Sequence, residues 1–245
     1  MGFLNKNFRM DKIRIYDRFV SLGLNCEISF ILYKIYGGVE SSLFQWASVP
    51  SVNFLEVLNN LSLIYSGKVI ENKEVNMWKC AVTSIAFHGK SLPHQLLDEH
   101  GKRDSEKVRA ELKETIKRIQ YLRDKFRIIA QSAETKLYIL GLHPNFYSDT
   151  KEKAVRFLQE IYTTLQKIAK NASLLVILEE KMQTKDIMQL DDNTAFFIRC
   201  IDHFAPMLKA TSHEEMDLQG YMKIFLEFYP DKLSKNEKKF KFEME

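Results

Sequence analysis

One cysteine, Cys26, stands where a protein most easily makes a nucleophile. It follows the run Ser21-Leu22-Gly23-Leu24-Asn25 and opens a stretch with apolar residues at helical spacing, which predicts a strand, a tight turn and a helix. The unpaired N–H groups and the positive dipole end of such a helix favour a thiolate. They are also suited to hold the oxyanion of a tetrahedral intermediate. We therefore expect Cys26 to be catalytic, and Ser21, Gly23 and Asn25 to contact the substrate.

Two other interpretations of this turn stay open. Cys26 could be a buried residue that fills the space between the strand and the helix without taking part in chemistry. The turn could also bind a phosphate, because a glycine and a helix N-terminus can cradle an anion. A dinucleotide-binding fingerprint needs further glycines after Gly23, and residues 24–27 supply none.

Six histidines are candidates for a general base. His88 is the best placed, because it ends the apolar stretch 83–87, where a strand would deliver its imidazole to a sheet edge. His143 directly follows a predicted strand and is expected to line the same edge as a substrate-binding residue. His203 is preceded by Asp202, an acid–histidine pair of the kind found in hydrolases. The others lie in polar surroundings and are expected to be exposed: His94, His100 and His213.

The sequence does not indicate a metal or another cofactor. No two histidines have the helical spacing of a zinc protease, and no cluster joins Cys, His and Asp at the spacing of metal ligands. A P-loop, a GxSxG elbow and a kinase signature are also absent from the sequence.

The elements that must position these residues follow a repeating pattern. Four apolar runs, at 19–23, 136–142, 174–178 and 195–201, alternate with helical patterns. Such alternation is typical of a parallel sheet covered by helices on both faces. The predicted fold is an α/β three-layer sandwich with a mostly parallel central sheet flanked by helices. We expect residues 1–245 to form a single domain, with 1–16 and 231–245 as peripheral ends.

Apolar faces predict helices at 52–63, 105–126 and 214–228, and another that begins at Asp149. Extended segments are predicted around 68–75 and 78–88. The polar loop at 89–104 is long enough to be a candidate lid over a substrate.

Composition places the chain among ordinary folded proteins, with 45% hydrophobic and 28% charged residues. Its three cysteines are widely spaced and form no CxxC pair, which favours a reducing cytoplasm over a disulfide framework. No stretch approaches the roughly 18 uncharged residues of a membrane helix. A net charge of +4 does not call for a specific nucleic-acid partner. The basic residues near both ends could still touch a membrane surface or a polyanion.

Two longer motifs resemble the opening of a bacterial family of papain-like cysteine peptidases, whose members carry an SLGxxC motif and then an aromatic-x-Trp element. These motifs are Phe19-Val20-Ser21-Leu22-Gly23-Leu24-Asn25-Cys26-Glu27 and Glu40-Ser41-Ser42-Leu43-Phe44-Gln45-Trp46-Ala47. The similarity continues at Ala86-Phe87-His88, in the basic stretch 118–127 and in the strand 137–139. It implies that Cys26 is the nucleophile and His88 the base.

Gly89 stands where the family more often has Asp, so the residue that orients the histidine is open. Asp202 and Asp217 are our candidates for that role. Phe44 and Trp46 are expected either to rim a substrate groove or to cover the core next to the first helix.

The predicted strand–turn–helix is closer to an α/β esterase or an SGNH-type hydrolase than to the papain fold. The expected function is a thiol-dependent hydrolase or acyl transferase that acts on a small-molecule, glycan or peptide substrate. The alternative is a glycan or nucleotide-sugar modifying transferase that binds phosphate at the same turn, which would suit the association of the resembled family with polysaccharide and surface-glycan gene sets. A third hypothesis is a binding module without catalysis.

Overall fold

The computed structural model describes residues 13–23, 27–37, 42–45, 47–64, 69–72, 77–89, 91, 93–144, 151–205 and 216–231. Its centre is a parallel sheet of four strands, which confirms the predicted α/β class. In spatial order the strands are β2 (Arg18–Ser21), β7 (Lys136–Leu142), β8 (Ala172–Glu179) and β9 (Phe196–Ile201), each parallel to the next. Every residue of β7 is buried, as expected for a strand covered on both faces. No helix in the described part of the chain is long and apolar enough to span a membrane.

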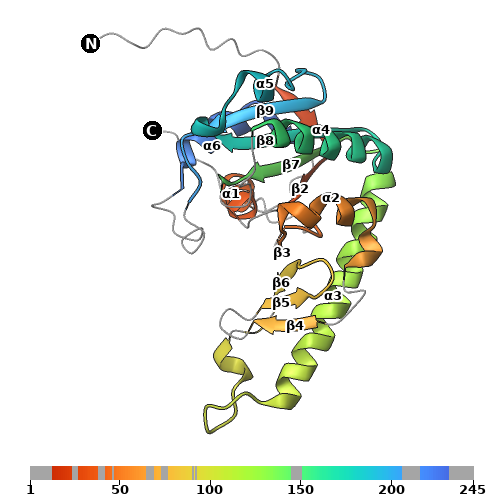
Figure 1. Ribbon diagram of the computed structural model, residues 1–245, viewed down its shortest axis with the longest axis vertical. Helices are drawn as coiled ribbons and strands as arrows, with labels where there is room; N and C mark the ends of the chain where they lie inside the picture. Colours follow the sequence, from red (N-terminus) through yellow and green to blue (C-terminus); the bar gives the residue numbers. More distant parts are fainter. Residues whose placement is uncertain are drawn as a thin grey trace, which may run out of the picture.

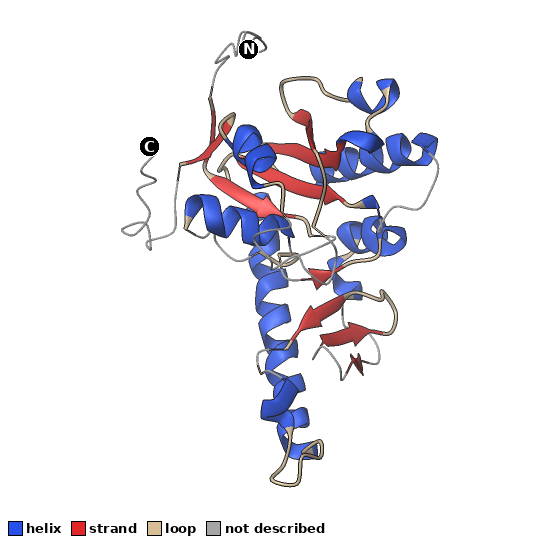
Figure 2. Cartoon of the chain, turned by 90° about the vertical axis from the view of Figure 1, so that its left-hand side faces the viewer, coloured by secondary structure: helices blue, strands red, loops and turns tan. Residues whose placement is uncertain are grey.

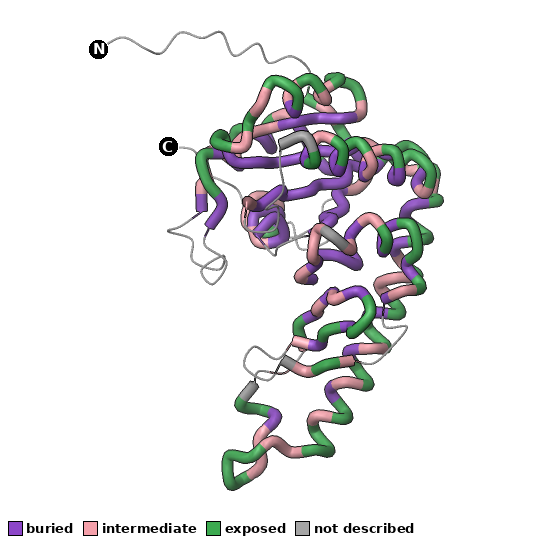
Figure 3. The backbone as a smooth tube through the Cα atoms, viewed as in Figure 1, coloured by how far each residue is buried: buried purple, intermediate pink, exposed green. Residues whose placement is uncertain are grey.

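The two faces of the sheet pack against different helices, which gives the three predicted layers. Tyr138 and Leu140 of β7 point to one core cluster, and Leu137 and Ile139 point to the other, as strand alternation requires. The first cluster includes residues of α2 (Ser51–Asn59), α3 (Ser105–Gln131), α4 (Lys151–Ile168) and α5 (Lys185–Met188). The second cluster includes residues of α1 (Glu27–Tyr36) and α6 (Leu218–Phe225). Figure 3 shows the buried strands of the sheet between these layers.

A second, antiparallel sheet lies beside α3 below the main sheet (Figures 1 and 2). Its strand order is β3 (Ala47–Ser48), β6 (Ala86–His88), β5 (Met77–Cys80) and β4 (Val69–Asn72). His88 therefore ends a strand of this small sheet and not a strand of the parallel sheet. The loop that follows contains the 3-10 helix η2 (Pro93–Leu96) and lies at the far end of α3 from the parallel sheet, so it does not cover that sheet's edge (Figure 1).

Helix α3 runs five residues beyond its predicted end at residue 126, because its last turn is packed and capped. Ile129 and Ala130 are buried in the first core cluster. The fully buried Lys136 reaches back from β7, and its Nζ donates to the Ser132 carbonyl at 2.8 Å and to the Ala130 carbonyl at 3.4 Å. A cation at the C-terminus of a helix opposes the negative end of the helix dipole.

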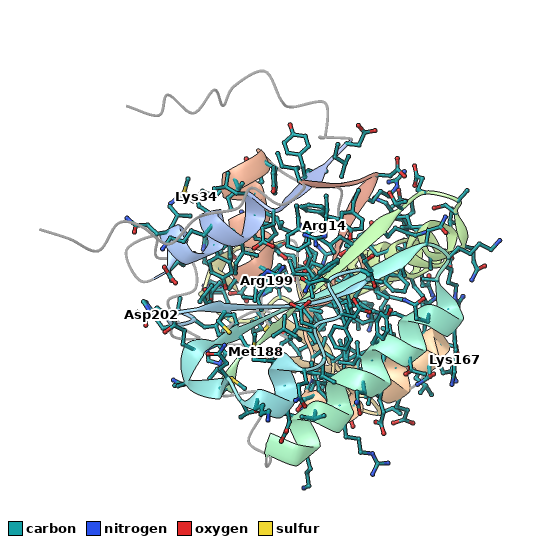
Figure 4. All side chains as sticks on the ribbon, turned by 90° about the horizontal axis from the view of Figure 1, so that it is seen from above. Arg14, Lys34, Lys167, Met188, Arg199 and Asp202 are labelled. Atoms are coloured by element: carbon teal, nitrogen blue, oxygen red, sulfur yellow. The ribbon has the colours of Figure 1, made fainter. Side chains whose placement is uncertain are left out.

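The two ends of the described chain meet in a short parallel ribbon. β1 (Arg14–Tyr16) pairs with β10 (Phe228–Pro230), so the predicted C-terminal helix stops at Phe225 and the chain continues as a strand. Arg14 and Arg199 of β9 both lie over the Phe197 ring, at 4.8 and 6.0 Å from its centroid (Figure 4). These contacts join the ribbon to the central sheet.

The outer edge of β9 is closed by two aspartates instead of a further strand. Asp192 Oδ1 accepts from the backbone N–H groups of Thr194, Ala195 and Phe196 at 2.8 to 2.9 Å. Asp191 Oδ2 accepts from the N–H of Ile198 at 3.1 Å. Carboxylates on an edge strand also prevent it from pairing with another chain. Burial alone would raise the pKa of Asp192, but the three N–H bonds outweigh it and leave the pKa below its ordinary value.

Asp192→Ala should lower the free energy of unfolding by about 0.5–2 kcal/mol at pH 7, because three N–H groups exchange their carboxylate acceptor for water. The loss should shrink as the pH falls below the ordinary Asp pKa of 3.8, since a lowered folded-state pKa stabilises only above the unfolded-state value. Urea unfolding at several pH values measures both effects. Asp186→Ala, an exposed aspartate in α5, is the matched control and should change stability little. An equal loss in both variants would contradict the role of Asp192.

Candidate functional site

Polar groups gather at the edge where the parallel strands end. The Gly23 turn follows β2, His143 follows β7, Glu179 ends β8 and Asp202 follows β9. Because the four strands are parallel, their carboxyl ends lie along one edge of the sheet. Ligand sites of open α/β sheets form at this edge.

The turn after β2 is shaped by a glycine that no other residue can replace without strain. Gly23 has a φ of +75°, and a Cβ at this position would lie 2.5 Å from the Phe44 carbonyl oxygen. The Ser21 Oγ accepts from the Gly23 N–H at 3.3 Å, and the Ser21 carbonyl accepts from Ser42 Oγ at 3.0 Å. Ser21 is only 1% exposed and shapes the turn, and its contact with the substrate stays a prediction. Asn25 and Cys26 lie outside the described residues.

Phe44 is a core residue and does not rim a groove. Its ring is fully buried and lies 5.6 Å from the rings of Phe54 and Phe126. The aromatic motif therefore packs the turn onto α2 and α3, which is the second of the two roles considered for it. Trp46, the other member of the motif, falls outside the described part of the chain.

The segment around Phe44 connects the β2–α1 turn to the strand of His88. Ser29 Oγ of α1 donates to the Gln45 carbonyl at 2.5 Å. Two residues later, Ala47 pairs with Phe87 in the antiparallel register of β3 and β6. In that register His88 follows Phe87 on β6, beyond the residues that pair with β3.

His88 itself is exposed, and the Arg118 guanidinium donates to its carbonyl oxygen. Partial desolvation lowers the pKa of the imidazole, and the positive charge of Arg118 lowers it further. The side chain is therefore mainly neutral at pH 7 and able to accept a proton.

Residues Asp202–Ala205, which we call the crossing segment, traverse the carboxyl ends of the strands. Each of three backbone N–H groups in it donates to a carboxylate from a different element. Asp202 donates to Asp217 Oδ2 at 2.9 Å, Phe204 to Glu179 Oε1 at 3.0 Å, and Ala205 to Glu27 Oε2 at 3.1 Å. The crossing segment thus runs from β9 past β8 to the N-terminus of α1.

Glu27 is the residue that sequence reasoning missed. Its carboxyl is fully buried and accepts from the Tyr221 hydroxyl at 3.0 Å as well as from Ala205. Burial raises the pKa of Glu27 to about 7, although both hydrogen bonds oppose the shift. The sequence shows only an acid in the first turn of a helix, which is common and usually exposed. Neither Ala205 nor Tyr221 is near it in the chain, so no local signal indicated the burial.

His143 lies at the predicted edge but under the crossing segment. It is 5% exposed, its ring lies 5.2 Å from the Phe204 ring, and its Nε2 lies 3.4 Å from the Ala205 carbonyl oxygen. Burial lowers the pKa of this imidazole. Its role in substrate binding stays a prediction.

The two candidate aspartates lie with His203 and not with His88. Asp217 caps α6, where its Oδ1 accepts from the Gly220 N–H at 2.8 Å. Asp202 Oδ2 contacts His203 Nδ1 at 3.1 Å. Both follow or adjoin β9, the strand at the opposite side of the sheet from β2. Their role as partners of His88 stays a prediction that the strand order does not favour, because β9 and β2 are the opposite edges of the sheet.

Among the described residues, no group of three His, Cys, Asp or Glu side chains is placed to hold a metal ion. No protein-family model, curated protein or solved structure matches the chain. The chemistry of this edge must therefore be argued from its own residues.

Gly23→Ala should destabilise the protein by roughly 2–4 kcal/mol, because the new Cβ meets the Phe44 carbonyl and adopts a strained φ. Gly101 provides a matched control, since its φ is +73° but nothing lies within 4 Å of a Cβ added there. Gly101→Ala should therefore cost only about 1 kcal/mol. Thermal unfolding of the two variants checks the difference, and equal losses would show that the contact with Phe44 is easily relieved.

Proposed function

We propose that the protein is a thiol-dependent hydrolase or acyl transferase in which Cys26 is the nucleophile and His88 the general base. The observation that carries this proposal is the connection of the β2–α1 turn to β6. Phe44 contacts Gly23, Gln45 bonds to Ser29 of α1, and Ala47 pairs with Phe87. These contacts link the strand of His88 to the turn after β2, which supports the proposed pairing.

In the proposed reaction, the Cys26 sulfur attacks the carbonyl carbon of an ester, thioester or amide while His88 accepts the thiol proton. The tetrahedral oxyanion is held by N–H groups at the start of α1. When the intermediate collapses, the bond to the leaving group breaks, and His88 returns the proton to that group. Water or an acceptor hydroxyl then attacks the thioester, which releases Cys26. The lowered pKa of His88 keeps the imidazole mainly neutral at pH 7 and therefore able to accept the thiol proton.

The acceptor that we propose for the thioester is a glycan hydroxyl. The resemblance described above, to a family associated with surface-glycan gene sets, supports a sugar ester as substrate or product.

Phosphate binding at the same turn is disfavoured by charge. Glu27 begins α1, and its pKa of about 7 means that it is partly ionised at neutral pH. Glu179 lies on the same edge, and its carboxylate accepts from the N–H of Phe204 in the crossing segment. Carboxylates beside a helix N-terminus occupy the positive potential that a phosphate would need. A nucleotide-sugar transferase is therefore the weaker of the two expected functions.

Alkylation by iodoacetamide as a function of pH tests the nucleophile. Cys26 should react with an apparent pKa clearly below that of a free thiol, about 8.5. Cys80 and Cys200 serve as controls within the same chain, because Cys80 is buried and desolvation raises the pKa of Cys200. Mass spectrometry of the labelled peptides separates the three sites. A pKa of Cys26 at the ordinary value would remove the basis for a thiolate nucleophile.

Hydrolysis of a p-nitrophenyl ester tests the base. His88→Ala should lower kcat roughly 10²- to 10⁴-fold, whereas His94→Ala, at an exposed position of η2, should leave it unchanged. His203→Ala is the discriminating variant, because His203 already has an aspartate partner. If His203→Ala is inactive and His88→Ala is active, the base has been assigned to the wrong histidine. Full activity of Cys26→Ala, together with stabilisation by a nucleotide, would favour the transferase.

A further inference from the structure

In the described part of the chain, no strand lies beside the crossing segment to hydrogen-bond with its backbone. Its N–H groups bond instead to side-chain carboxylates, and those of Phe204 and Ala205 are at buried residues. Buried N–H groups that lose their acceptors cost about 1–3 kcal/mol each. The position of this segment therefore depends on the acids that hold it.

Glu27 differs from the other two acids in what it joins. Asp217 belongs to the N-terminus of α6 and Glu179 to the end of β8, and each holds the backbone close to its own element. Glu27 lies on α1 and binds both the crossing segment, through Ala205, and the middle of α6, through Tyr221. Its carboxyl is therefore the point at which three separate elements meet.

We propose that Glu27 is the residue that positions the crossing segment over the edge of the parallel sheet, and that the segment loosens when the Glu27 carboxyl loses its proton. Both oxygens of this carboxyl are hydrogen-bonded in a site with no exposure to solvent. A neutral carboxyl is accommodated there without the cost of burying a charge. The inference concerns the segment alone and does not require Cys26 to be a nucleophile.

Burial favours the neutral form of Glu27, whereas most of the groups around it favour the ionised form. Tyr221 faces it from α6, Glu179 from the end of β8 and His203 from the crossing segment. Desolvation raises the pKa of Glu27 most, and the charge of Glu179 raises it further. The bonds from Tyr221 and Ala205 and a positive charge on His203 lower it, but the pKa remains about 7. His143, which contacts the Ala205 carbonyl, also has a lowered pKa and brings little positive charge at neutral pH.

The direction of the pH effect follows from these values. A folded-state pKa raised from 4.5 to about 7 stabilises the closed segment most below pH 4.5, and this contribution is lost as the pH rises toward 7. Opening of the segment should therefore become easier by up to roughly 100-fold between pH 4.5 and 7, and should level off at higher pH.

Amide hydrogen exchange at Ala205 and Phe204 measures this opening directly. After correction for the intrinsic pH dependence of exchange, protection of Ala205 in the unmodified protein should fall across pH 5–7. In Glu27→Gln, whose amide can still accept from Ala205 and donate to Tyr221, protection should stay constant over the same range. Glu179→Gln is the matched control: it removes the charge of a neighbouring acid but should keep the pH-dependent fall.

Tyr221→Phe provides a second variant in case Glu27→Gln does not fold. The Tyr221 hydrogen bond lowers the pKa of Glu27, so its loss should move the fall in protection to higher pH. The proposal is overturned if protection of Ala205 is independent of pH in the unmodified protein, or if Glu27→Gln keeps the same fall. A pH-dependent fall in an enzymatically inactive protein would leave this inference standing and count against the proposed function alone.

Discussion

The structure depends on how the backbone N–H groups of the crossing segment find hydrogen-bond acceptors, since no described strand lies beside it. The strands of a parallel sheet are buried between helices. The buried N–H groups of a segment that crosses the strand ends therefore need acceptors from the segment itself or from other elements. Here three acids from α1, β8 and the start of α6 supply them. The Tyr221 hydroxyl, which donates to Glu27, ties α6 to α1 on the second face of the sheet. Removing the crossing segment would take one hydrogen-bond donor away from each of the buried carboxyls of Glu27 and Glu179.

This arrangement also sets the electrostatics of the turn before α1. An acid in the first turn of a helix normally opposes the positive end of the dipole. Glu27 does so only when ionised, and burial keeps a large share of it neutral near pH 7. The field at the start of α1 is therefore less compensated than the sequence suggests. A thiolate or an oxyanion next to that helix would still meet the ionised share of Glu27, as a phosphate would.

Sequence patterns predicted the central sheet well, because long apolar runs allow few alternatives. The bounds of β7 agree with the predicted strand at 136–142, and β9 begins one residue later than expected. The strands β1 and β10 were not predicted, since each has only three residues and gains its stability from the other, more than 200 residues away. Pairing between such short, distant segments leaves no periodicity in the sequence.

The candidate site was predicted less well for the same reason. Strand propensity around His88 was evident, but propensity does not say which sheet a strand joins, and β6 pairs with β3 and β5. A phenylalanine such as Phe44 is as common in a ligand groove as in a core. Only its packing against Phe54 of α2 and Phe126 of α3 shows that it belongs to the core. Asp217 caps the N-terminus of α6, where it accepts from the N–H of Gly220 three residues later. Such capping could have been suspected because Asp is a favoured N-cap residue. The network around Glu27 joins residues 27, 205 and 221, and it could not be found without the fold.

The β1–β10 ribbon affects how the chain is made. During synthesis, residues 14–16 emerge from the ribosome before the four central strands, and their partners at 228–230 emerge after them. Ile15 lies in β1 and Ile13 lies next to it, and both side chains are exposed. β1 has no partner until β10 has been synthesised. The central sheet can assemble in the order β2, β7, β8 and β9, each beside its predecessor. The second face can close only after α6 and β10 have been synthesised, because the Tyr36 hydroxyl donates to the carbonyls of Phe225 and Phe228. A nascent chain stalled before that point would carry an unpaired strand edge and an uncovered face, which are the features that chaperones bind.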